Sequence, residues 1–214
     1  ASARESFEIV RRRLFQPIES KEAFKARDAV IRAFLDLYRA HAADFPIDTQ
    51  DPDYRTRFEA AYPIHPELFE RLYDDWGSLE RFQRTRGVLR LMASVIHALW
   101  EEQDGGLLIL PSMLPMHRPA VQDELTRYLE NNWRPVLERD IDGGHSVSLA
   151  LDREKPNLGR YSACRRVARA VYIGSAPNLK AANRGIEEKR VRPACVQPGE
   201  SAATAKRPAA AKSA

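Results

Sequence analysis

Three arginines surround a single glycine in the stretch Phe82-Gln83-Arg84-Thr85-Arg86-Gly87-Val88-Leu89-Arg90-Leu91-Met92. From Leu89 onward apolar residues recur at helical spacing and predict one buried stripe, made of Leu89, Met92, Ala93, Ile96, Leu99 and Trp100. A polar stripe of the same period runs beside it through Gln83, Arg86, Arg90, Ser94 and His97. The pattern predicts that a short helix breaks here and a longer one begins, with Arg86 and Arg90 one turn apart.

The chemistry of Arg86 and Arg90 suits a phosphate group. A guanidinium is always charged, and its planar fork of donors matches the oxygens of a phosphate. The alternative interpretation is a solvated arginine face over a core helix, because most exposed arginines have no such task. The pattern alone leaves both interpretations open.

The residues before this stretch predict amphipathic helices separated by breaks. A first helix over residues 4–15 ends before Pro17, since proline lacks an N–H and disfavours helix in the preceding residue. Ser20 is the expected N-cap of a second, long helix. Two prolines and three aspartates between residues 44 and 52 predict a loop.

The segment that leads into the arginine stretch predicts a shorter helix over residues 66–76. Pro66 suits the first helical position, where an N–H would have no partner, and Gly77 is a natural stop. His65 lies between two prolines, so we expect a structural or capping residue rather than a catalytic base.

Beyond residue 103 the chain also predicts helices. The short apolar run over residues 107–110 is either a strand or a buried loop. Helices are expected over residues 120–130 and 133–141, and another begins around Leu158, with Tyr161, Cys164, Ala168 and Val171 on one face. No internal repeat and no series of strands is evident, so the predicted fold class is mainly α.

Composition indicates an ordinary globular protein. The chain has 214 residues, of which 43% are hydrophobic and 30% charged. No apolar run approaches the roughly 20 residues of a membrane helix, and the first residues lack a signal-peptide core. Two distant cysteines argue against a disulfide framework and for a reducing, cytoplasmic location. Three of the 34 basic residues lie after residue 200. The other 31 nearly balance the 30 acidic residues, so the rest of the chain has almost no net charge.

Several catalytic motifs are absent from the sequence. The five histidines and two cysteines lack the spacing of a zinc site, so no metal site is predicted. The sequence contains neither the Gly-x-x-x-x-Gly-Lys-Ser/Thr loop that cradles phosphates nor a Gly-x-Gly-x-x-Gly. If the arginines serve a nucleotide, its main binding site lies outside these 214 residues.

Several segments together resemble a known family. They are Tyr62-Pro63-Ile64-His65-Pro66-Glu67-Leu68-Phe69, Asp75-Trp76-Gly77-Ser78-Leu79, Phe82 through Ala93, Arg166-Val167-Ala168-Arg169, Ile173-Gly174-Ser175-Ala176-Pro177, Asn183-Arg184-Gly185-Ile186-Glu187 and Cys195-Val196-Gln197-Pro198-Gly199-Glu200. They resemble the C-terminal half of the prokaryotic AAA+-like P-loop ATPases called domain of unknown function 499. The resemblance covers nearly all of residues 5–200, and Gln83 through Arg90 is its most specific part.

The resemblance implies a helical ATPase lid. Gly87-Val88-Leu89-Arg90 is similar to the Gly-x-x-Arg of the AAA+ sensor-2 helix, whose arginine reaches the γ-phosphate. It therefore assigns a catalytic role to Arg90 and nucleotide binding to Arg86, Gly87 and Arg90. One of Arg11, Arg12 and Arg13 would act in trans on the nucleotide of a neighbouring subunit.

The resemblance also implies partners and cofactors. ATP and Mg²⁺ would be held by a Walker core N-terminal to this chain, and none by this chain alone. A homo-oligomer is expected. DNA or DNA-modification enzymes are expected as further partners, in a DNA-modification or phage-defence system. No association with a membrane is expected. The sequence starts after the position of the Walker core and departs from the family after residue 200, which indicates a fragment or a degenerate gene.

These inferences divide the chain into three parts. Residues 1–103 would contain the lid, residues 104–200 a further small helical segment with a winged-helix-like form as one option, and residues 201–214 a disordered, alanine-rich basic tail. A rival hypothesis is a non-catalytic helical module that binds DNA or an acidic protein through Arg165, Arg166 and Arg169. A third is a degenerate product without a stable role.

Overall fold

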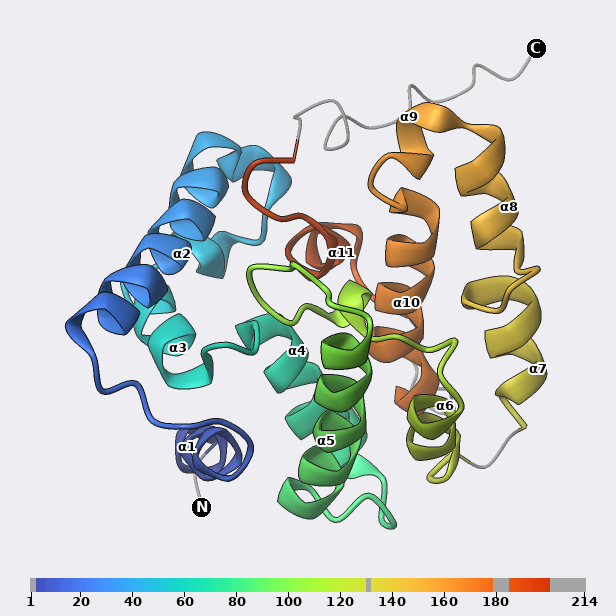
Figure 1. The fold of residues 1–214 in the computed structure, drawn as a ribbon, viewed down its shortest axis with the longest axis horizontal. Coiled ribbons are helices and arrows are strands. Elements are labelled where there is room, and N and C mark those ends of the chain that lie inside the picture. Colours follow the sequence, from blue (N-terminus) through green and yellow to red (C-terminus); the bar gives the residue numbers. More distant parts are fainter. Residues whose placement is uncertain (1–2, 130–131, 179–184, 201–214) are drawn as a thin grey trace.

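The computed structural model describes residues 3–129, 132–178 and 185–200, and these segments are almost entirely helical (Figure 1). The predicted tail, residues 201–214, lies outside the described residues, as do residues 183 and 184 of the family resemblance. The α-helices are α1 (Ala3–Leu14), α2 (Lys21–Ala40), α3 (Tyr54–Ala61), α4 (Pro66–Glu70), α5 (Thr85–Glu101), α6 (Pro119–Thr126), α7 (Arg134–Val136), α8 (Val147–Glu154), α9 (Pro156–Gly159), α10 (Ala163–Ser175) and α11 (Glu188–Cys195).

Shorter turns of helix connect these elements. Two of them are π-helical, η3 (Arg71–Asp75) after α4 and η6 (Leu137–Ile141) after α7. The others are 3-10 turns, η1 (Ala42–Asp44), η2 (Ile47–Gln50), η4 (Trp76–Ser78), η5 (Pro111–Met113) and η7 (Ala176–Asn178). The prediction of a mainly α protein is confirmed.

The described residues contain no strand, so the winged-helix option has no β-hairpin in this part of the chain. The apolar run over residues 107–110 forms one isolated parallel bridge, between Ile109 and Ile64, and is otherwise a loop in which Leu107 is exposed and Leu108 and Leu110 are buried. The Ile109 amide donates to the Pro63 carbonyl at 3.0 Å, and the His65 amide donates to the Ile109 carbonyl at 3.0 Å. These two hydrogen bonds therefore hold the segment before α4 against the 107–110 loop.

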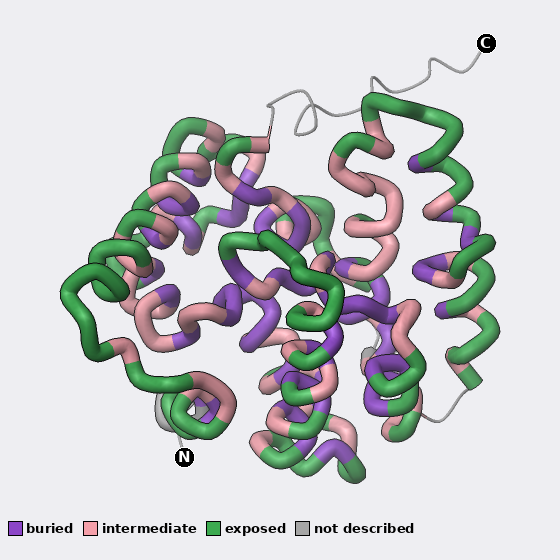
Figure 2. Tube along the Cα trace, in the orientation of Figure 1, coloured by how far each residue is buried: buried purple, intermediate pink, exposed green. Residues whose placement is uncertain are grey.

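Two buried clusters form most of the core. Figure 1 shows α2 and α3 on one side, α7 and α8 on the other, and α5 between them. The larger cluster joins α1, α4, α5, α6, η6 and α10, and the smaller joins α2, α3 and the 108–110 loop. The larger one contains residues from both sides of position 103, and the Trp76 indole spans them by donating to the Ile173 carbonyl at 2.9 Å. Figure 2 shows these buried residues running through the centre.

The expected helix caps are confirmed. The Ser20 hydroxyl accepts a hydrogen bond from the Ala23 amide at 3.1 Å at the start of α2. His65 is fully buried, its Nδ1 accepts from the Glu67 amide at 3.0 Å, and its Nε2 lies 2.7 Å from the Tyr38 hydroxyl. Burial, reinforced by the charge of Arg57, lowers the pKa of His65 to about 3, so the ring is a neutral structural group.

The predicted buried stripe of α5 is only partly right. Met92 is buried, but Ala93 is exposed and Trp100 is 70% exposed. The buried face instead carries Gly87, Val88, Leu91, Met92, Val95 and Ala98, while Leu89, Ile96 and Leu99 are half-buried. Because α5 is apolar around most of its circumference, periodicity alone does not decide which face turns inward; packing against α1 and α6 does.

A single buried carboxylate, Asp142, ties several elements together. It follows η6, and its Oδ1 accepts hydrogen bonds from the Arg165 guanidinium at 2.7 Å and the Arg169 guanidinium at 2.6 Å, both on α10. Its Oδ2 accepts from the His117 amide at 2.8 Å and lies 3.2 Å from His117 Nδ1. Burial alone would raise the pKa of Asp142, but the His117 hydrogen bond and the Arg169 and Arg165 charges lower it to about 2.

We predict that Asp142→Asn destabilises the fold severely. The substitution leaves Arg165 and Arg169 buried without their counter-charge, which typically costs about 3–5 kcal/mol. Chemical denaturation should show that loss in the free energy of unfolding. The control is Asp140→Asn, which removes a solvent-exposed pair with Arg139 and should cost less than about 1 kcal/mol. Similar losses for both variants would contradict the central role of Asp142.

A second prediction concerns pH. His117 also lies 2.7 Å from Glu102 through Nε2, and its hydrogen bond to Asp142 raises the pKa of the imidazole above 6.5 despite partial burial. Protonated His117 therefore stabilises the folded state at pH below 6.5, and this contribution disappears as pH rises through the raised folded pKa. Unfolding curves at a series of pH values should show this decline in the parent and its absence in His117→Gln. A decline of equal size in that variant would assign it to other groups.

Candidate functional site

The break before α5 is built by backbone geometry. Gln83 and Arg84 both have positive φ angles, 56° and 43°, so the chain turns sharply between the buried Phe82 and the first residue of α5, Thr85. Gly87 lies against this turn, and a Cβ atom there would be 2.1 Å from the Phe82 carbonyl oxygen. Only a glycine lets the first turn of α5 pack this closely on the break.

Arg90 projects from the next turn of α5 and is held by an acid from α6. Its Nη2 lies 3.2 Å from Oε1 of Glu124, and the same oxygen lies 3.1 Å from Nη2 of Arg127. The Tyr128 hydroxyl donates to the other oxygen of Glu124 at 3.3 Å. The Glu124 side chain is 10% exposed, whereas that of Arg90 is 46% exposed. A mostly buried carboxylate thus fixes one edge of a guanidinium whose other edge faces solvent.

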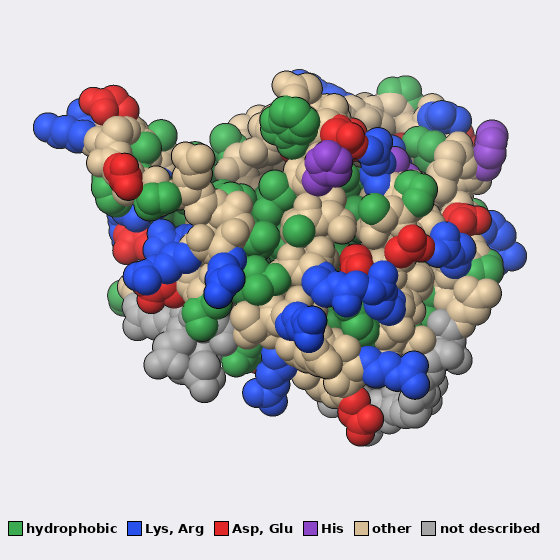
Figure 3. Space-filling view, turned by 60° about the horizontal axis from the view of Figure 1, so that its bottom comes forward, with side chains coloured by type: hydrophobic (Ala, Val, Ile, Leu, Met, Phe, Trp, Pro, Cys, Tyr) green, Lys and Arg blue, Asp and Glu red, His purple; other side chains and the backbone are tan. Residues whose placement is uncertain are grey.

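Arg86 completes a basic surface, which we call the α5 arginine cluster: Arg86, Arg90 and Arg127. Arg86 is exposed one turn before Arg90, and its guanidinium has no acceptor or carboxylate partner among the described residues. Among the described residues, Glu124 is the only ion-pair partner of the other two guanidiniums, so the cluster carries three positive charges and one negative charge pairs with two of them. Figure 3, which brings the lower end of Figure 1 forward, shows Lys and Arg side chains gathered across this face. Such a surface attracts anions.

The N-terminal arginines occupy different environments on α1, which packs against α5. Arg12 is exposed and its guanidinium lies 2.6 Å from Glu8. Arg13 is exposed, while Arg11 is half-buried and its Nε has no hydrogen-bond partner among the described residues. These three arginines are the candidates for a role in trans. Of them, Arg13 is the one that is exposed and forms no ion pair with an acid of the described chain.

The three arginines proposed to contact nucleic acid are engaged inside the fold. Arg165 and Arg169 bind Asp142, and Arg166 contacts Glu200. Their side chains are 22%, 12% and 17% exposed, respectively. The sequence did not indicate Asp142 as their partner, because it lies in a Gly-Gly turn more than 20 residues away. These three arginines therefore leave little exposed positive charge on α10 that could contact DNA.

Two absences limit the chemistry of the described residues. They contain no group of histidines, cysteines and acids arranged to hold a metal ion, and none of their helices is long and apolar enough to span a membrane.

Comparison with known proteins identifies the family. The model of the DUF499 second domain matches residues 1–183, which is most of the chain. The chain therefore belongs to the DUF499 family, and the suspected resemblance is confirmed. Neither the curated proteins nor the solved structures gave a match.

We predict that Gly87→Ala destabilises the protein by about 1–3 kcal/mol, the usual cost of overpacking. The added methyl group would overlap the Phe82 carbonyl oxygen and ring, so the break before α5 must shift. Gly105→Ala is the matched control, because a Cβ there has no neighbour within 4 Å. Thermal or denaturant unfolding measures both variants. Equal stability of the two would show that the close contact at Gly87 does not constrain the start of α5.

Proposed function

We propose that this DUF499 domain is the helical lid of an AAA+-like ATPase, in which α5 presents Arg90 to the γ-phosphate of ATP. The observation that carries this proposal is the position of Arg90, half exposed at the start of α5 and oriented by the buried Glu124. The Gly-x-x-Arg pattern of the sensor-2 helix supports the same residue. The nucleotide and Mg²⁺ are held by a Walker core on another stretch of polypeptide, since these 214 residues contain no Walker loop.

Glu124 favours this role because it orients Arg90 before the phosphate arrives. Only one nitrogen of the Arg90 guanidinium contacts Glu124, so its remaining donors can turn to a phosphate without breaking that contact. A pre-oriented side chain loses less conformational entropy when it binds than a free one. Arg86 adds a second positive charge one turn away, and Arg127 a third on the other side of Glu124.

The expected consequence is coupling between the nucleotide state and the position of the lid. A hydrogen bond to a charged group contributes about 1.5–3 kcal/mol, which is enough to bias a two-state lid by roughly tenfold or more. Loss of the γ-phosphate on hydrolysis removes that bias. In the proposal, Arg90 senses the triphosphate, and the helices packed on α5 transmit the change.

The biological setting in this proposal rests on family membership alone. The ATPase would work as a homo-oligomer in a DNA-modification or phage-defence system, with an N-terminal arginine acting on the neighbouring subunit. Arg13 is the first choice among the three, because its side chain is exposed and not engaged by an acid of the described chain.

Arg90→Ala tests the proposal in the protein that carries the Walker core together with this domain. We expect ATP hydrolysis to fall about tenfold or more, equivalent to about 1.4 kcal/mol of transition-state stabilisation, while ATP binding changes much less. Glu124→Gln should give a smaller loss, because it loosens Arg90 without removing it. Arg139→Ala is the control, since that side chain is 83% exposed and forms an ion pair with its neighbour Asp140.

Steady-state hydrolysis and nucleotide titration provide the two readouts, and a thermal melt shows that each variant is folded. Equal hydrolysis rates for Arg90→Ala and the parent would remove Arg90 from the site. An equal fall for Arg139→Ala would mean that the loss reflects surface charge in general.

A further inference from the structure

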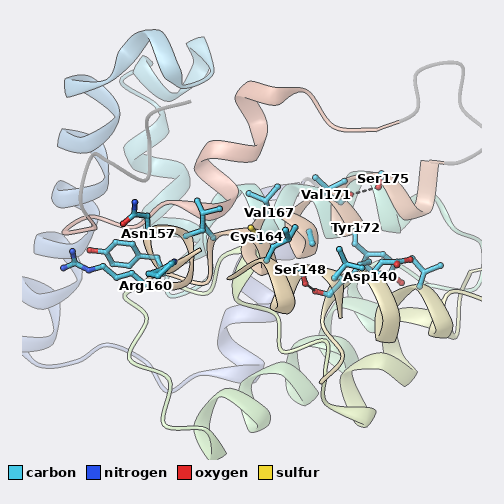
Figure 4. Close-up of a pocket in the computed structure, with 18 of the residues that line it drawn as sticks. Asp140, Ser148, Asn157, Arg160, Cys164, Val167, Val171, Tyr172 and Ser175 are labelled. Atoms are coloured by element: carbon cyan, nitrogen blue, oxygen red, sulfur yellow. Dashed lines mark hydrogen bonds between the residues drawn. The ribbon is translucent and has the colours of Figure 1, made fainter. Parts of the chain in front are cut away.

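An open apolar groove lies between α8 and α10. It has a volume of about 1100 Å³, and its two ends are closed by α9 and by the α7–η6 segment (Figure 4). It lies on the opposite side of α10 from α11. None of the residues assigned to the α5 arginine cluster lines it.

Exposed apolar residues are concentrated on the walls of the groove. Of the nine large hydrophobic residues that are exposed in the described chain, four line this groove: Val147 at 53%, Leu151 at 37%, Val167 at 44% and Val171 at 38%. Such clustering marks an interaction site, because isolated exposed apolar residues are normal whereas contiguous ones are not. The sequence correctly placed Cys164, Ala168 and Val171 on one helix face, although α10 begins at Ala163 rather than around Leu158, and these residues line the open groove.

The shape of the groove fits a helix. Val147 and Leu151 are four residues apart on α8, and Val167 and Val171 are four residues apart on α10, so each wall is an i, i+4 ridge. The valley between two such ridges accepts the apolar side chains of a third helix. α10 has 13 residues and is therefore about 20 Å long, which matches a partner helix of three to four turns.

The two ends of the groove differ in charge. Arg160 and Asn157 lie at one end, and Asp140, which is paired with Arg139, lies at the other (Figure 4). Arg160 is exposed, stacks on the Tyr161 ring at 5.1 Å and has no ion pair within the described chain. A helix carries partial negative charge at its carboxyl end and partial positive charge at its amino end. Its favourable orientation thus places the carboxyl end at Arg160, antiparallel to α10.

We propose that this groove binds an amphipathic α-helix from another domain of the same DUF499 protein, with its carboxyl-terminal, acidic end against Arg160. The source is argued from the family match, which describes this chain as a second domain, so family members contain at least one other. A second copy of this chain fits less well, because two concave faces leave a void between them. The inference does not depend on the role of Arg90.

The first test uses two fluorescein-labelled helical peptides and the chain itself. Both peptides carry leucines at every third or fourth position; one has glutamates at its carboxyl end and lysines at its amino end, and the other has these charges exchanged. Fluorescence anisotropy should show that the glutamate-ended peptide binds about three- to fivefold more tightly, the usual contribution of an exposed ion pair. Arg160→Glu should reverse that preference.

Groove variants make this test specific. Val167→Glu places a charge on the groove wall and should abolish binding of both peptides, whereas Ile47→Glu, at a residue that is 86% exposed and outside the groove, should leave it unchanged. Failure of both peptides to bind at concentrations up to about 1 mM would overturn the proposal. So would a dimer that Val167→Glu dissociates in sedimentation experiments, or saturable binding of laurate without binding of either peptide.

The second test identifies the source of the helix through Cys164, which lines the groove. We expect N-ethylmaleimide to label Cys164 at least about tenfold more slowly in the multidomain protein than in this chain, and Val167→Glu to restore labelling. Cys195 is buried and serves as the internal reference. Equal labelling of Cys164 in both proteins would overturn the assignment to another domain. Arg90→Ala should not alter the labelling, which separates this outcome from the proposed ATPase role.

Discussion

The structure depends on one buried negative charge. Asp142 receives two guanidiniums from α10, and both the amide and the imidazole of His117, so it joins η6, the segment before α6 and α10 at one point. His117 extends the network to Glu102 at the end of α5. Because an unpaired buried charge is costly, these groups must assemble together, and their assembly sets the relative positions of α5, α6 and α10.

A second acid, Glu124, also forms ion pairs with two arginines. Its carboxylate is also mostly buried, but the guanidiniums of Arg90 and Arg127 that it contacts reach outward. The arginines at Asp142 are mostly buried inside the fold, while those at Glu124 keep donors available to solvent. This contrast separates a structural arginine from one that can bind an anion, and it is the reason that the proposed function rests on α5 rather than on α10.

The two proposed binding surfaces are formed by different helices. The α5 arginine cluster is polar and would respond to a phosphate, whereas the groove between α8 and α10 is apolar and would hold a helix continuously. The Asp142 network lies between them, because it joins α10 to the segment that leads into α6. A helix anchored in the groove would therefore be connected mechanically to the helices that carry Arg90.

Local chemistry in the sequence was sufficient for much of the fold. The mainly α class, the long helix after Ser20 and the capping role of His65 all follow from caps, prolines, glycines and periodicity within a few residues. These features depend on neighbours along the chain, so the sequence by itself determined them. It also carried the family resemblance that the match over residues 1–183 confirms.

Tertiary structure alone decided which face of α5 is buried and which arginines are free. α5 is apolar around most of its surface, so contacts with α1 and α6, not the period, turned Leu91 and Val95 inward and left Trp100 exposed. The arginines of α5 and α10 look alike in sequence, but Arg169 meets Asp142 across 27 residues and Arg90 meets Glu124 across 34. Charge pairing at such separations depends on the packing of whole helices, which no local pattern encodes.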